Sequence, residues 1–120
     1  MNKQTEAFKQ RLITLVIDII KLQKKLPKSL ENSIFFKQII RSSSSIGANY
    51  QEAQFAHTRK DFAQKLSISL KETNETIYWL ELIHKANNCL LDILIGETNE
   101  IKMILTKITK SIKFNLPSKC

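Results

Sequence analysis

The stretch Arg41–Ala53, RSSSSIGANYQEA, decides how the rest of the chain is interpreted. Four consecutive serines followed by isoleucine, glycine and alanine are compatible with a flexible linker, a phosphate-binding loop or the closely packed middle of a helix. Apolar or small residues recur every three or four positions straight through the serines, at Phe36, Ile39, Ser43, Ile46, Tyr50 and Ala53. A linker has no reason to keep this register, so the spacing predicts a helix over about residues 32–55.

The short side chains at positions 42–45, with Gly47 and Ala48, would let another helix approach this one closely. Glycine inside a helix costs about 1 kcal/mol relative to alanine. Close helix packing is a plausible offset for that cost. The stretch therefore predicts a tight helix–helix contact.

Upstream of this stretch, a heptad-like seam predicts a first helix over residues 5–25. Its members are Phe8, Leu12, Leu15, Ile19, Leu22 and Leu26. Pro27 ends the helix, because a residue that precedes proline is disfavoured in the α region. A second apolar stripe, Ile13, Val16 and Ile20, lies beside the seam. It is either part of a wide core or a surface for a neighbouring subunit, and we favour the subunit.

Downstream, Thr58 with Asp61 three residues later resembles a capping box and predicts a third helix over residues 58–86. Its expected seam is Ala63, Leu66, Leu70, Thr73, Ile77, Leu80, His84 and Asn87. Gly96 interrupts the next apolar run, where either a short helical turn precedes it or the fourth helix begins early. We place a fourth helix at about residues 97–113, with a stripe at Ile101, Ile104, Leu105, Ile108 and Ile112.

A chain of 120 residues with two glycines and two prolines has little material for the many turns of a β fold. We expect one domain over residues 1–120. The fold class is all-α, an antiparallel up-down four-helix bundle.

The chain is basic, with 19 Lys and Arg against 11 Asp and Glu, a net charge of +8 and a pI near 9.6. This charge favours nucleic acid over a membrane or an acidic protein as partner, although a lysine-rich solvated surface accounts for it equally well. Residues 1–28 carry seven basic and two acidic residues. The candidate nucleic-acid-binding residues are Lys9, Arg11, Lys21, Lys24, Lys25, Lys28, Arg59 and Lys60.

Motifs for catalysis are missing from the sequence. No glycine-rich phosphate loop occurs. Glu81-x-x-His84 has the spacing of one half of a di-iron site, but no second such pair exists. We therefore expect no enzyme activity, metal, cofactor or small-molecule substrate. Cys89 and Cys120 have no C-x-x-C partner, and no signal peptide or membrane span is evident, so a cytoplasmic protein with free thiols is expected.

Two blocks carry a resemblance to a known family. They are Arg-Ser-x-x-Ser-Ile-x-Ala-Asn-x-x-Glu-Ala at Arg41–Ala53 and Leu-Lys-Glu-x-x-Glu-Thr-x-Tyr-Trp-Leu at Leu70–Leu80. The Leu-Pro exit of the first helix and Arg-Lys-Asp-Phe at 59–62 also match. The chain resembles the bacterial four-helix bundle proteins encoded by intervening sequences in 23S ribosomal RNA genes.

This resemblance implies a bundle that assembles into a homopentameric ring. It is similar in architecture to the accessory variability protein of diversity-generating retroelements, a basic pentamer that works with nucleic acid. The resemblance supplies no catalytic residues. Polar and aromatic residues of the matching blocks are expected to make structural or interface contacts: Arg41, Ser45, Asn49, Glu52, Asp61, Phe62 and Glu72. Two functions stay open, a non-enzymatic oligomer that binds RNA or DNA and a scaffold with a protein partner.

Overall fold

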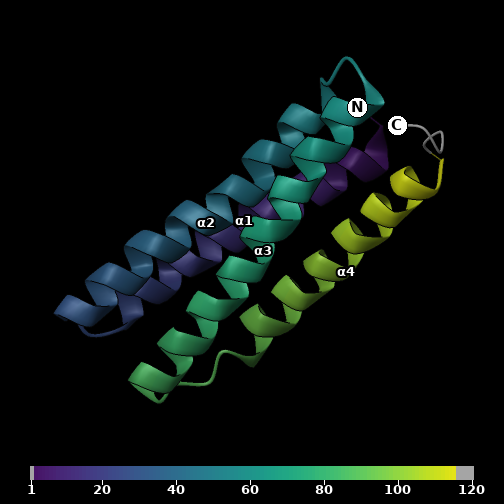
Figure 1. The fold of residues 1–120 in the computed structure, drawn as a ribbon. Helices are drawn as coiled ribbons and strands as arrows, with labels where there is room; N and C mark the ends of the chain where they lie inside the picture. The colour runs from purple at the N-terminus through teal and green to yellow at the C-terminus, as the bar shows by residue number, and fades with distance from the viewer. Residues whose placement is uncertain (1, 116–120) are drawn as a thin grey trace.

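Four long helices joined by short connections form the described chain (Figure 1). The computed structural model describes residues 2–115, with side chains as far as residue 112. The helices are α1 (Lys3–Lys25), α2 (Leu30–Gln54), α3 (Arg59–Asn87) and α4 (Asp92–Asn115). The described residues contain no strand. The molecule is elongated, with extents of 51 × 27 × 21 Å. The all-α, four-helix prediction is confirmed.

Three helices begin at residues that cap them in the expected way. The side chains of Asn2, Ser29 and Thr58 each accept a hydrogen bond from the backbone N–H three residues later, at 2.8, 3.1 and 3.0 Å. These bonds satisfy N–H groups that have no partner within the helix. α3 ends at Asn88, whose left-handed backbone (φ 50°, ψ 45°) stops the helix. The chain therefore turns at Asn88 toward α4.

The predicted start of the fourth helix at residue 97 is wrong. α4 begins at Asp92, and the first backbone bond runs from the Ile95 N–H to the Leu91 carbonyl at 2.9 Å. Gly96 lies inside the helix and is exposed. Leu91 is buried, and Leu94 and Ile95 pack against the core. This apolar contact holds the first turn in place despite the glycine.

The seam of α2 is buried as predicted. All six of its members are nearly inaccessible, with exposed fractions of 5% or less. α1 contributes Phe8, Leu12, Leu15 and Ile19 to the same core, and α4 contributes Ile101 and Leu105.

The predicted seam of α3 is partly wrong. Leu70, Ile77 and His84 are only half-buried, whereas Ser69, Thr76 and Ile83 are buried. The buried stripe of α3 therefore passes through two small polar residues that the hydropathy pattern assigns elsewhere.

These small polar residues lie at the contact between α2 and α3. The Ser69 hydroxyl donates to the Ile46 carbonyl at 2.6 Å, and the Ser42 and Thr76 hydroxyls are 2.8 Å apart. A side-chain bond to the backbone of a facing helix requires the two helices to lie close together. The tight contact predicted from the serine run is therefore made with α3. On the α1 side, a Cβ added at Gly47 would meet the Leu12 Cβ at 3.5 Å, an ordinary contact.

Candidate functional site

Four of the predicted cations gather at the end of α1 and the connection to α2. We call Lys21, Lys24, Lys25 and Lys28 the lysine cluster, and all four are exposed. None of them makes an ion pair with any residue that the structure describes. Lys24 and Lys25 lie in the last turn of α1, where cations complement the helix dipole. The cluster is a compact group of unneutralised positive charge.

The other four predicted cations lie elsewhere. Arg59 and Lys60 begin α3 and so lie at the opposite end of the bundle, beside the α2–α3 connection (Figure 1). Lys9 is half-buried along the side of α1. The eight residues therefore do not form one face of the chain.

Arg11 is tied to α4. Its guanidinium makes a two-bond contact with the Glu97 carboxylate, Nε–Oε2 at 3.1 Å and Nη2–Oε1 at 2.8 Å. Glu100 lies 3.3 Å from the same Nη2. The hydrogen bond to Glu97 raises the pKa of Arg11. The carboxylates of Glu97 and Glu100 balance the positive charge of the Arg11 guanidinium, so this side chain attracts an external phosphate only weakly.

A second lysine group, which the sequence analysis missed, lies on α4. Lys102, Lys107 and Lys110 are exposed on the part of this helix that follows Glu100, whereas its described acidic residues, Asp92, Glu97 and Glu100, all precede them. A net charge taken over the whole chain averages these acidic and basic residues and conceals their separation along the helix. Separate counts for the two halves of α4 would have found it.

An apolar groove runs between α1 and α2, with a volume of about 260 Å³. Ile13 and Ile17 on its α1 side are 45% and 44% exposed. The Gln51 side-chain oxygen is buried there without a hydrogen-bond partner among the described atoms. The full lining is Lys9, Leu12, Ile13, Val16, Ile17, Ser43, Ser44, Gly47, Ala48 and Gln51. Two members of the second apolar stripe of α1, Ile13 and Val16, thus line this groove, and Ile13 is partly exposed to solvent.

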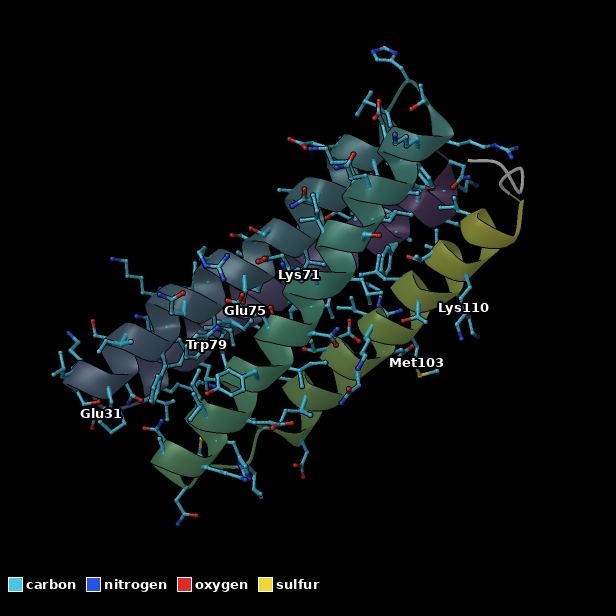
Figure 2. The ribbon with its side chains drawn as sticks, viewed as in Figure 1. Glu31, Lys71, Glu75, Trp79, Met103 and Lys110 are labelled. Carbon is cyan, nitrogen blue, oxygen red and sulfur yellow. The ribbon has the colours of Figure 1, made fainter. Side chains whose placement is uncertain are left out.

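Charged and aromatic residues of the two matching blocks meet on the α2–α3 surface. Arg41 forms ion pairs with Glu72, at 3.1 Å, and with Glu75. The Trp79 indole N–H donates to the Glu75 carboxylate at 3.0 Å, and Figure 2 shows the two residues near each other on α3. The hydrogen bond from the indole is the largest cause that lowers the pKa of Glu75 below its usual value, and the Arg41 guanidinium lowers it further. Phe35 lies against the Trp79 ring, with centroids 6.3 Å apart.

The remaining block residues make local contacts. The Asn49 amide donates to the Ser45 carbonyl at 2.9 Å, and Glu52 pairs with Lys65 on α3 at 2.7 Å. The backbone N–H of Asp61 donates to the Thr58 hydroxyl, and Phe62 packs against the core.

Glu81 and His84 do not form part of a metal centre in the described residues. No group of three or more His, Cys, Asp or Glu side chains between residues 2 and 112 is placed to hold a metal ion. The His84 ring nitrogen Nδ1 instead contacts the Cys89 carbonyl in the α3–α4 connection. Cys89 is a free thiol, and Cys120 lies outside the described residues. Within residues 2–115, no helix combines the length and apolar character needed to cross a membrane.

The chain is similar to a known family and to a solved structure. The sequence profile of the 23S rRNA-intervening sequence protein family matches residues 5–112. A crystal structure of a protein of unknown function from the S23 ribosomal protein family of Bacteroides thetaiotaomicron is 37% identical, with a TM-score of 0.79. That match covers 88% of this chain and 97% of the other. No curated protein shows significant sequence similarity. With nine-tenths of its length matched, the chain belongs to the 23S rRNA-intervening sequence protein family.

Proposed function

We propose that this protein is a non-enzymatic, basic, self-associating helical bundle that binds RNA or DNA through phosphate contacts. The observation that supports it most directly is the lysine cluster, four exposed ammonium groups without carboxylate partners in the described structure. Phosphate contacts position a nucleic acid without reading its sequence, and compact lysine ammonium groups are suited to them. The net charge of +8 favours the same class of partner.

The proposal includes an antiparallel up-down bundle that assembles with copies of itself, with a pentameric ring as the expected form. The α1–α2 groove supports self-association, because Ile13 and Ile17 expose apolar surface beside small residues of α2. A helix from a second copy would cover both isoleucines. Assembly would also bring several lysine clusters onto one particle.

Nucleic-acid binding is tested by fluorescence anisotropy with a labelled RNA between about 50 and 200 mM salt. Binding should weaken steeply with salt, because each neutralised phosphate releases counterions. The triple variant Lys24→Gln, Lys25→Gln, Lys28→Gln should lower the slope of log K against log salt by roughly 2 to 3. Its matched control replaces three exposed lysines outside the cluster, Lys3 on α1, Lys37 on α2 and Lys71 on α3, with glutamine. If the unaltered protein does not bind structured RNA even at low salt, the proposal is wrong.

Self-association is tested by measuring the native mass of Ile13→Glu and Ile17→Glu variants. A carboxylate in the groove should give a monomer with an unchanged circular dichroism spectrum, because both side chains are already partly exposed. Ile93→Glu is the control, since Ile93 is 88% exposed and lies on α4. An unchanged oligomer in both groove variants would remove the groove from the proposal.

The second candidate is a scaffold whose partner is another protein, with lysines serving solubility. The same exposed groove favours it, as does the separation of the predicted cations to opposite ends of the chain. Native mass measured with and without nuclease treatment separates the candidates. Loss of co-purifying nucleic acid on treatment supports the first, and a stable complex with an unrelated protein supports the second.

A further inference from the structure

Between Asn99 and Lys110, α4 presents a basic surface on its exposed side. We call Asn99, Lys102, Met103, Thr106, Lys107 and Lys110 the α4 basic face, and together they line a shallow depression of about 430 Å³. No carboxylate lines this depression. Figure 2 shows Met103 and Lys110 on the outer side of α4, pointing away from α3.

The packing of α4 fixes the direction of this face. Ile101, Leu105 and Thr109 are buried in the core, so the side chains on the opposite side of the helix face solvent. Lys102 and Lys110 are eight residues apart, which places them on one side of the helix at roughly 12 Å along its axis. Lys107 lies between them. Met103 is 58% exposed and adds apolar surface beside the ammonium groups.

The charge of this face is not neutralised within the described chain. Its three lysines make no ion pair with a described side chain, whereas Glu97 and Glu100, nearer the start of α4, are both directed to Arg11 on α1. The helix dipole favours cations only in the last turn. Lys102 lies well before the end of α4 at Asn115, so the dipole does not explain its position.

We propose that the α4 basic face is a second nucleic-acid contact, which binds the phosphodiester backbone of one strand. This inference rests on the proposed function and adds a surface that the lysine cluster does not include. Successive phosphates of one stacked strand rise by about 3.4 Å, so roughly 12 Å spans about four of them. The three lysines contact phosphate oxygens, and Met103 lies against the sugars. With no aromatic residue on this face, bases do not stack on it, and the contacts are to the backbone.

The test compares two triple variants. One changes Lys102, Lys107 and Lys110 to glutamine, and the other changes the same three residues to arginine. The probes are labelled 20-nucleotide single strands of mixed-sequence RNA and DNA, titrated between about 50 and 200 mM salt. The glutamine variant should lower the salt slope by about 2, at about 0.7 per lost contact on a single strand. The arginine variant should keep the slope, because its charge is the same. Circular dichroism checks that these exposed changes leave the helices intact.

Several outcomes separate this inference from the proposed function. If the unaltered protein binds and the α4 glutamine variant matches the control at Lys3, Lys37 and Lys71, the α4 inference is wrong and the proposed function stands. If the α4 variant weakens binding while the lysine-cluster variant does not, the inference holds and the cluster is not the contact. Absence of binding by the unaltered protein overturns both. Competition by poly-glutamate as strong as by unlabelled RNA also overturns the inference, because the face would then accept any polyanion.

Discussion

Replacement of Ser69 by leucine tests the close packing of α2 on α3. Ser69 is fully buried, and its hydroxyl donates to the Ile46 carbonyl at 2.6 Å. Carbon and carbonyl oxygen approach to about 3.3 Å at closest. A leucine Cγ at the hydroxyl position would therefore be roughly 0.7 Å too close to that oxygen. The leucine side chain also carries two further methyl groups that need space.

The expected cost has two parts. Loss of the hydrogen bond costs about 1 kcal/mol, which the Ser69→Ala variant measures alone. Overpacking adds about 1 to 3 kcal/mol, so Ser69→Leu should lower the free energy of unfolding by about 2 to 4 kcal/mol. For a chain of this size that corresponds to a fall in Tm of roughly 8 to 16 °C. Urea unfolding followed by circular dichroism gives the free energies directly.

Ser67→Leu is the matched control. Ser67 lies on the same helix, two residues away, and is exposed, so the same change should alter stability by no more than about 0.5 kcal/mol. If Ser69→Leu is as stable as Ser67→Leu, α2 and α3 are not closely packed at this point. The explanation given for the small residues of both helices would then be wrong.

Three further predictions concern other parts of the fold. Gly96→Ala should raise the free energy of unfolding by about 1 kcal/mol, because an added Cβ meets no atom within 4 Å; a fall in Tm would contradict this. Asn32 and Asn87 bond each other through both amides, at 2.9 and 2.8 Å. Each change to alanine should cost about 1 to 3 kcal/mol in urea unfolding, and a double variant that costs the full sum would argue against the pairing. Glu75 has a folded pKa below its ordinary 4.5, so its advantage over Glu75→Gln should be present at pH 7 and lost as pH falls through that lowered pKa. An advantage in urea unfolding that persists at pH 2 would refute the assignment.

The sequence predicted α2 well because its signals agree. The seam through Ser43 and Ile46 keeps one register over the whole helix, and both residues are buried. Ser29 caps the start of the helix. Where pattern and capping point to the same boundary, local sequence is enough to place a helix.

The seam of α3 was harder to predict at Ser69 and Thr76, because hydropathy treats hydroxyl residues as surface residues, although Thr73 was placed in the seam and is buried. The Thr73 and Thr76 hydroxyls donate to carbonyls four residues earlier, at 2.8 and 2.9 Å, so burial leaves them satisfied. Ser69 finds its acceptor on another helix. The sequence does not show that the Ile46 carbonyl will face Ser69. Without this acceptor, a buried serine on that side of α3 could not be predicted.

The charged residues of the candidate site were hard to predict for the same reason, because their partners lie far away in the sequence. Arg11 and Glu97 are 86 positions apart, and no local pattern in the sequence indicates that they pair. Counting charge by segment therefore placed Arg11 among the free cations and overlooked Lys102, Lys107 and Lys110. Which cations are available depends on which carboxylates the fold brings beside them.

The positions of the proposed surfaces make assembly and nucleic-acid binding separable. The α1–α2 groove shares no residue with the lysine cluster or the α4 basic face. A helix seated in the groove would therefore leave both sets of lysines outside the lining that it covers. If both proposals hold, a monomeric Ile13→Glu variant should keep each chain's phosphate contacts and lose the added affinity that comes from linking several chains. Loss of the contacts themselves on dissociation would instead mean that the binding surface is formed between subunits.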